Sequence, residues 1–114
     1  MSEDIFCKII NKELPASIVA EGEYWLAIKD IHPQAPVHVL ILYKKHLPGL
    51  EGAANVDAEI LGNLLLAANE VASRVGLGKG FRLIINSGED SERGVDHLHI
   101  HLLGGKRLGA KIVN

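Results

Sequence analysis

The chain has 114 residues, a hydrophobic content of 47% and a formal net charge of −2 at pH 7. The length suits one domain, residues 1–114, and the apolar content is enough to build a core. The near balance of charge lacks the positive surplus of a protein that binds nucleic acid through its phosphates. No apolar run approaches the roughly 20 residues of a membrane helix, and the acidic start of the chain is unlike a secretory signal. We therefore expect a soluble, cytoplasmic protein that binds neither nucleic acid nor a membrane.

The first half of the chain predicts a short helix and then three strands. Asp4 can cap a helix over residues 5–11, which Leu14-Pro15 follows. Cys7, the only cysteine, excludes an intrachain disulfide, and its position suits a small apolar residue on the first turn. Apolar or aromatic runs separated by turn residues predict strands over residues 18–20, 24–29 and 37–43.

The second half predicts one long helix between loops, followed by two strands. Apolar residues recur at three- and four-residue steps over residues 56–75, which predicts an amphipathic helix ended by Gly76 and Gly78. Strands are expected over residues 81–86 and 97–103, with loops over residues 44–55 and 87–96. The short connections favour an α+β fold with a five-stranded, mainly antiparallel sheet, one long helix and a short N-terminal helix. The apolar long helix suggests burial against a second copy, most simply in a twofold dimer.

Three histidines alternate with aliphatic residues in the last predicted strand. A strand sends successive side chains to opposite faces, so His97, His99 and His101 are expected on one face, above a core of aliphatic residues. Imidazole can act as nucleophile, base, acid or cation near neutral pH. Because histidine is not a favoured strand former, three at strict period two point to an enzyme rather than to structural residues.

A metal site is the main chemical alternative for these histidines. His-x-His on a strand is a common zinc arrangement. However, His97 and His101 are expected roughly 13 Å apart along the strand, too far to converge on one ion. A site built from two of the three with His46 remains open, but we expect no metal and no cofactor.

Several motifs in chain order resemble the histidine triad (HIT) family, in particular its branch of small histidine triad nucleotide-binding proteins. The His-apolar-His-apolar-His pattern and its two following apolar residues match at every position of residues 97–103. Four further segments match: Ile5-Phe6-Cys7-Lys8-Ile9-Ile10, Asp30-Ile31-x-Pro33-Gln34-Ala35-Pro36-x-His38, Lys44-Lys45-His46 and Leu103-Gly104-Gly105. The likeness covers almost the whole chain and implies a HIT-like fold, in a homodimer whose two five-stranded sheets join into one of ten strands.

The resemblance also implies a reaction and its catalytic residues. It implies binding of purine nucleoside monophosphates and hydrolysis of their phosphoramidates, with His99 attacking phosphorus and a nucleotidyl-imidazole intermediate. A hydrogen bond from the other ring nitrogen to a backbone carbonyl would fix the neutral tautomer. His97 and His101 would then donate to the phosphoryl oxygens. His46 resembles a fourth histidine of the family and would add a donor near the phosphate, although a loop histidine at a strand end is the plainer interpretation.

The nucleotide's other parts require different residues. By resemblance, Asp30 would accept both ribose hydroxyls, as a carboxylate suits a vicinal diol. Four apolar residues would sandwich the base, although singly they are ordinary core residues: Phe6, Ile9, Ile28 and Ile31. Asn86 resembles an asparagine that contacts the region of the scissile phosphate, and is equally an ordinary turn residue. His38 matches a family position but is interpreted as structural or supporting, and His32 stands where the family usually has a small residue beside the ribose.

The chain departs from the family just before the triad, where it has Arg93, Gly94 and Val95 at expected nucleotide-binding positions. Gly94 offers no side chain where a hydroxyl or carboxylate would help the departing amine, and such general acid help is typically worth 10²–10⁴-fold. Arg93 can instead clamp an anionic group. A slow enzyme, or one with other leaving groups, is therefore expected. The alternatives are a nucleotide-binding or scaffold protein with little turnover, or a dinucleoside polyphosphate hydrolase of the same family.

Overall fold

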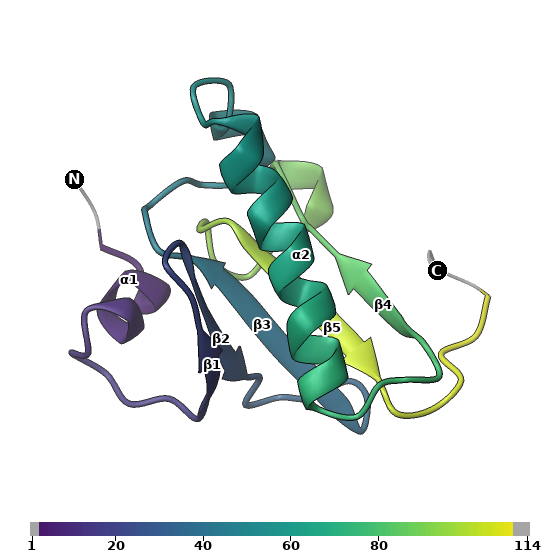
Figure 1. Cartoon of the computed structure of the whole chain (residues 1–114). Coiled ribbons are helices and arrows are strands. Elements are labelled where there is room, and N and C mark those ends of the chain that lie inside the picture. The colour runs from purple at the N-terminus through teal and green to yellow at the C-terminus, as the bar shows by residue number, and fades with distance from the viewer. Residues whose placement is uncertain (1–2, 111–114) are drawn as a thin grey trace.

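Five antiparallel strands form one sheet in the order β1-β2-β3-β5-β4. The computed structural model describes residues 3–110. The strands are β1 (Ile18–Glu21), β2 (Trp25–Lys29), β3 (Val37–Tyr43), β4 (Phe81–Ile84) and β5 (His99–Gly104). Figure 1 shows the single long helix crossing this sheet, and the α+β prediction is confirmed.

Two helices flank the sheet, and a carboxylate caps each. α1 (Ile5–Ile10) begins after Asp4, whose side chain accepts a hydrogen bond from the Cys7 N–H at 2.7 Å. α2 (Ala58–Arg74) begins two residues later than predicted because Asp57 is the cap, accepting from the Glu59 N–H at 2.8 Å. Two predicted loops contain short 3₁₀ turns, η1 (Leu50–Gly52) and η2 (Glu89–Ser91). No helix within residues 3–110 is long and apolar enough to cross a membrane.

The last strand begins later than the histidine pattern predicted. His97 was expected as its first residue, but β5 begins at His99. The His97 N–H donates to the Val95 carbonyl at 2.9 Å in a tight turn, and the Leu98 N–H donates to the Leu47 carbonyl at 2.6 Å. The backbone of His97 therefore belongs to the turn. β4 likewise ends at Ile84, two residues before the predicted end at Asn86.

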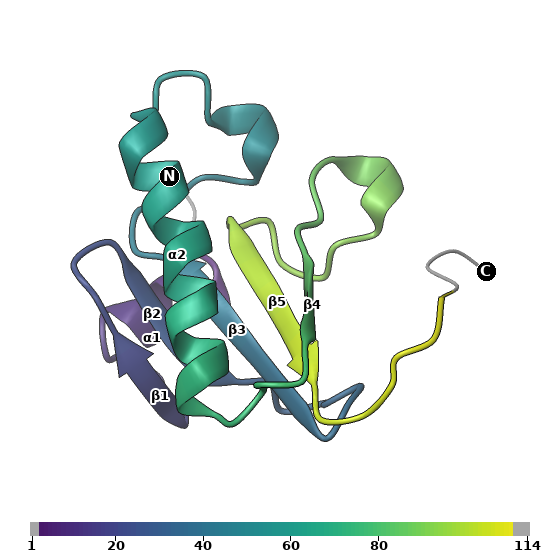
Figure 2. The same ribbon diagram turned by 45° about the vertical axis from the view of Figure 1, so that its right-hand side comes forward.

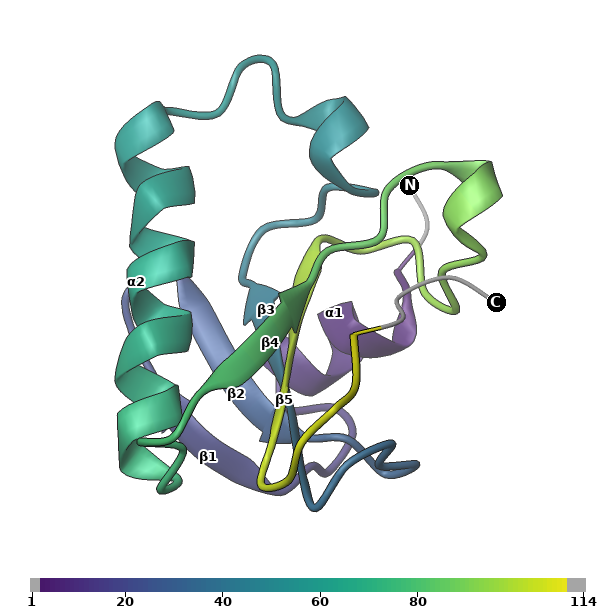
Figure 3. The same cartoon turned by 90° about the vertical axis from the view of Figure 1, so that its right-hand side faces the viewer.

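Each helix covers one face of the sheet, as the turned views show (Figures 2 and 3). The α2 face buries the larger core, in which Ile41, Ile100 and Leu102 pack against Val71 and Ala68. The α1 face holds a smaller cluster that includes Phe6, Leu26, Ile28, Leu40 and Leu42. Strict alternation along β3 and β5 thus directs one set of side chains to α2 and leaves the other facing α1.

Candidate active site

Two triad histidines lie on the α1 face of β5. In the sheet, His99 lies opposite Leu42 of β3 and His101 lies opposite Leu40. Leu40 and Leu42 belong to the smaller cluster, whereas Ile100, between the two histidines, belongs to the larger core. The Phe6 ring meets His99 edge to face, with centroids 5.0 Å apart, and the His99 and His101 rings are also 5.0 Å apart. The sheet and α1 together hold these rings in a fixed row.

The contacts of His99 prepare one of its nitrogens for attack. Its Nδ1 lies 2.5 Å from the His97 carbonyl oxygen, which can only accept, so Nδ1 carries the proton and donates it. The lone pair is therefore on Nε2. Burial lowers the pKa of His99 below its ordinary value of 6.5 and outweighs the hydrogen bond to the His97 carbonyl, which raises that pKa. His99 is consequently a neutral imidazole with a basic Nε2 at pH 7.

A relay of hydrogen bonds fixes the tautomer of His101. The Gln34 N–H donates to His38 Nδ1 at 3.0 Å, so the proton of a neutral His38 is on Nε2. His38 Nε2 lies 2.9 Å from His101 Nδ1 and donates to it, which places the proton of His101 on its own Nε2. Burial, with the charges of His99 and His38, lowers the pKa of His101 to about 4. His101 is thus a neutral donor through Nε2.

Asp30 lies beside the same relay, just after β2. Its Oδ1 accepts from the His32 N–H at 2.8 Å, and its Oδ2 lies 3.4 Å from His38 Nε2. The backbone therefore orients the carboxylate next to the His38–His101 pair. The expected ribose acceptor and one expected phosphate donor come together on the α1 face.

The hydrogen-bond partners of His97 differ from those of the other two triad histidines. Its side chain is fully buried, its Nε2–H donates to the Tyr43 carbonyl at 2.7 Å, and its Nδ1 lies 3.0 Å from Asp4 Oδ2. His46 joins the same group, with Nδ1 2.9 Å from Asp4 Oδ2. Burial raises the pKa of Asp4, but the Cys7 N–H and His97 outweigh it and lower that pKa below its ordinary value, so Asp4 is a carboxylate.

The HIT domain family model matches residues 11–108. The chain belongs to the HIT family. An uncharacterized HIT-like protein of Synechocystis sp. is 54% identical over 107 residues, 93% of this chain and 94% of that protein. A HIT family hydrolase from Clostridium thermocellum is 47% identical, with a TM-score of 0.92 over 99% of both chains. A 14 kDa zinc-binding protein of Zea mays is 48% identical over 94% of this chain and 85% of its own.

The apolar residues expected around a base occupy different environments in this HIT chain. Phe6 and Ile28 are buried in the smaller cluster, and Ile9 and Val95 pack against it. Ile31 is 84% exposed. The first four therefore form a wall under α1, whereas Ile31 stands free beside Asp30.

Just before the triad, ion pairs hold the Arg93 side chain in place. The Arg93 side chain, 11% exposed, forms ion pairs with Glu51 at 2.6 Å and Asp96 at 2.8 Å. An anion that recruits Arg93 has to compete with these carboxylates. A Cβ at Gly94 meets no atom within 4 Å, so the site has room for a side chain there. Asn86 is partly buried, two residues beyond β4.

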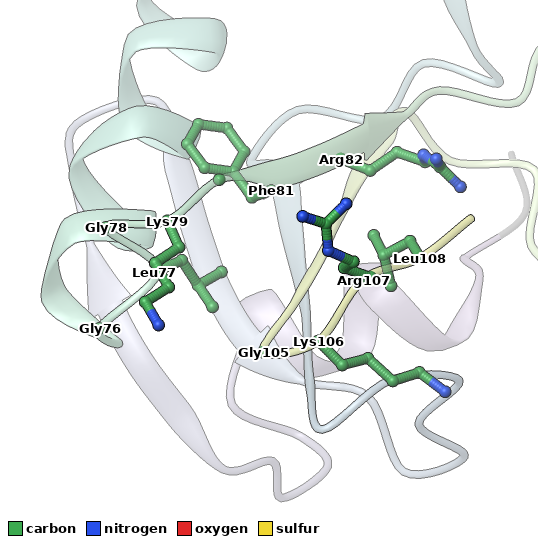
Figure 4. A pocket seen from close by; sticks show the side chains of 11 residues that line it. Gly76, Leu77, Gly78, Lys79, Phe81, Arg82, Gly105, Lys106, Arg107 and Leu108 are labelled. Carbon is green, nitrogen blue, oxygen red and sulfur yellow. The ribbon is translucent and has the colours of Figure 1, made fainter. Parts of the chain in front are cut away.

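A cavity of about 1030 Å³ lies away from the histidines, between the α2–β4 connection and the segment after β5. It is lined by residues 76–82 and 105–108. Figure 4 shows four basic side chains around it: Lys79, Arg82, Lys106 and Arg107. None of the expected catalytic or nucleotide-binding residues contributes to this cavity.

Sequence reasoning assigned too small a part to His38 and Cys7. His38 sets the tautomer of His101, and its alternation with Leu40 and Leu42 along β3 is the signal that placed it on the same face. The Cys7 Sγ atom lies 3.6 Å from His97 Nδ1 and 3.5 Å from His46 Nδ1. No local pattern signalled these contacts, because His46 and His97 are 39 and 90 residues from Cys7 in the sequence.

Proposed function

We propose that this HIT protein hydrolyses purine nucleoside phosphoramidates to a nucleoside monophosphate and an amine, as a member of the small nucleotide-binding branch. The observation that carries the proposal is the His99 Nδ1–H bond to the His97 carbonyl, which leaves a neutral Nε2 lone pair on a rigid strand. The description of the Clostridium thermocellum relative as a hydrolase supports it.

The reaction proceeds in two displacements at phosphorus. His99 Nε2 attacks phosphorus, the P–N bond breaks, and the amine departs with a proton taken up from solvent water. A second water then attacks the nucleotidyl-imidazole and loses a proton to solvent, the N–P bond breaks, and the nucleoside monophosphate leaves with neutral His99 restored. The His101 Nε2–H donates to a phosphoryl oxygen, where charge develops in both steps.

The remaining parts of the nucleotide fit the neighbouring residues. Asp30 accepts the ribose hydroxyls, and the wall that includes Phe6, Ile9 and Ile28 receives the base. Donation by His97 and His46 to phosphate oxygens stays a prediction, because their ring nitrogens have the other partners described above. In this proposal, Arg93 and Gly94 lie beside the leaving amine, and Asn86 lies beside the phosphate.

A homodimer completes the proposal. β4 is an edge strand with exposed apolar side chains, including Phe81 and Ile84, and α2 exposes Leu65 and Leu66. Antiparallel pairing of two β4 strands makes one ten-stranded sheet.

Steady-state hydrolysis of an adenosine 5′-phosphoramidate, measured by release of the amine, tests the activity. We expect turnover by the wild type and a loss of roughly 10⁴-fold or more in kcat/KM in His99→Ala. AMP binding by equilibrium dialysis is measured in parallel. AMP binding without turnover by the wild type would favour the nucleotide-binding or scaffold alternative.

A further inference from the structure

The cavity between the α2–β4 connection and the segment after β5, here called the basic cavity, concentrates positive charge. Four basic residues line it and no Asp or Glu does: Lys79, Arg82, Lys106 and Arg107. The whole chain has 12 Lys and Arg against 14 Asp and Glu, so this surplus is local. The volume of about 1030 Å³ is at the upper end of the roughly 300–1,000 Å³ typical of small-molecule sites. The basic cavity therefore suits an extended anion.

Neighbouring carboxylates do not neutralise these positive charges. Within residues 3–110, none of the four basic side chains forms an ion pair, whereas Arg93 pairs with both Glu51 and Asp96. Arg82 donates to a backbone carbonyl, that of Gly109, at 2.5 Å. Because like charges around one cavity repel one another, a bound anion would relieve that repulsion.

The backbone of the α2–β4 connection adds neutral donors to the same wall. The N–H groups of Gly78 and Lys79 have no backbone acceptor among the described residues, whereas those of residues 76, 77 and 80 have one. A Cβ at Gly78 meets no atom within 4 Å, and Gly78 does not have a positive φ. Neither packing nor backbone conformation therefore requires glycine at this position. The missing side chain instead leaves the backbone open to a ligand.

The carbonyls at the C-terminal end of α2, which disfavour a nearby anion, are already hydrogen-bonded. The Gly76 N–H donates to the Ser73 carbonyl at 3.2 Å. The Leu77 N–H donates to the Ala72 carbonyl at 2.9 Å. Arg74 adds a positive charge in the last turn of the helix. The partial negative charge of the helix end is therefore offset beside the basic cavity.

The basic side chains are spread around the cavity rather than gathered at one point (Figure 4). Lys79 lies on the α2–β4 connection, and Lys106 lies on the segment after β5. The Arg107 side chain extends from that segment toward β4. A linear anion with several charged groups matches this arrangement better than a single phosphate, and a guanidinium group can bind each phosphoryl group with two hydrogen bonds.

We propose that the basic cavity binds a linear oligophosphate, either free or as the phosphate chain of a nucleoside polyphosphate. Lys79, Lys106 and Arg107 supply the charge, and the N–H groups of Gly78 and Lys79 donate to phosphoryl oxygens. This site is separate from the proposed hydrolase centre, because none of the catalytic or nucleotide-binding residues lines the cavity.

Most of the cavity wall lies outside the strand edge that the proposed dimer uses. Among the lining residues, Phe81 and Arg82 belong to β4, and the others belong to the connections before β4 and after β5. We therefore expect a dimer of this chain to bind one oligophosphate per chain.

Titration of the whole protein with sodium tripolyphosphate, monitored by calorimetry and by amide chemical shifts in NMR, tests the site. We expect saturable binding of one equivalent per chain and a thermal midpoint that rises with ligand concentration. The largest amide shifts are expected at residues 78–79 and 105–107. The affinity should fall as the ionic strength rises.

A double variant that removes positive charge identifies the contacts. Lys79→Gln combined with Arg107→Gln changes two exposed positions, so it should weaken tripolyphosphate binding by roughly 10-fold or more. Circular dichroism should show an unchanged fold. Lys12→Gln combined with Lys29→Gln is the matched control, because it removes the same charge from exposed positions outside the cavity. The control should bind within about 2-fold of the wild type.

ATP distinguishes the two sources of the phosphate chain. Tighter binding of ATP than of tripolyphosphate, with shifts at the same amides and loss in the Lys79→Gln and Arg107→Gln variant, identifies a nucleoside polyphosphate. Weaker or equal binding of ATP identifies the free oligophosphate. Both results support the site.

Other results would overturn the proposal. One is the absence of saturable tripolyphosphate binding, as when a second chain covers the cavity. Another is a set of amide shifts confined to residues around His99, or wild-type affinity in the variant with both Lys79→Gln and Arg107→Gln. A third is equally tight binding of an oligoglutamate of the same charge, because the cavity would then recognise an acidic peptide rather than phosphate.

Discussion

At the scale of single residues, one backbone donor decides the tautomers of two histidines. Because the Gln34 N–H occupies His38 Nδ1, the proton order along His38 and His101 is fixed before any ligand arrives. Such preorganisation removes the need to rearrange protons as charge develops on the phosphoryl oxygens. His38 is therefore a positioning residue that acts through His101.

The substitution His38→Ala tests this relay. Without the donor to Nδ1, His101 is free to carry its proton on either nitrogen, so we expect kcat/KM to fall by roughly 10-fold, less than the 10²–10³-fold for removing a donor outright. Two-dimensional NMR of the imidazole nitrogens should show mixed tautomers of His101 in this variant. A single Nε2–H tautomer of His101 in His38→Ala would contradict the account.

The lowered pKa of His99 gives a pH dependence with a definite sign. Protonation removes the Nε2 lone pair, and burial lowers the pKa of His99 below its ordinary value of 6.5. We therefore expect kcat/KM to fall as the pH is lowered, with the midpoint of this acid limb below pH 6.5. A pH profile of phosphoramidate hydrolysis checks this, and an acid limb centred above 6.5 would exclude a buried neutral His99 as the nucleophile.

At the scale of elements, the sequence predicted which segments form helices and strands but misplaced several of their ends. Hydrophobic periodicity revealed α2 and the alternation of β5, because both depend on residues near in sequence. The start of β5 depends on backbone hydrogen bonds from residues 97 and 98 to the Val95 and Leu47 carbonyls. The side-chain partners of His97 come from the N-cap of α1 and from the end of β3. Such long-range contacts are not visible in local patterns.

The cap of α2 provides a prediction for stability. Asp57→Ala removes the acceptor of the Glu59 N–H and should lower the free energy of unfolding by about 1 kcal/mol. Because α2 covers the face opposite the histidines, AMP affinity should not change (Figure 3). Chemical denaturation and dialysis measure the two quantities.

A control separates the cap from general surface effects. Glu70→Ala, on the exposed side of α2, removes only a solvent-exposed pair with Arg74. It should leave the unfolding free energy within about 0.5 kcal/mol. Equal destabilisation by the two variants would refute the capping role of Asp57.

At the scale of the whole molecule, the open edge of β4 determines the expected assembly. The sequence predicted a dimer from the apolar character of α2, and the structure adds an edge strand with unpaired backbone groups and exposed apolar side chains. Ile84→Glu places a charge at the end of that edge, so we expect a shift from about twice the 12.3 kDa chain mass toward the monomer. Light scattering after size exclusion measures it.

Leu14→Glu is the matched control for the dimer. It introduces the same charge at an apolar residue of similar exposure outside the sheet. This variant should keep the wild-type mass. A monomeric wild type, or an Ile84→Glu variant that remains dimeric, would place the interface elsewhere or remove it.

The identity of the atom that attacks phosphorus is the centre of the account. Rapid acid-free quenching of the protein with an adenosine phosphoramidate, followed by intact-mass and peptide mass spectrometry, measures it directly. We predict an adenylyl adduct on His99 in the wild type and no adduct in His99→Ala. An adduct on another residue, or equal labelling of His99→Ala, would contradict the assignment of His99 as the nucleophile.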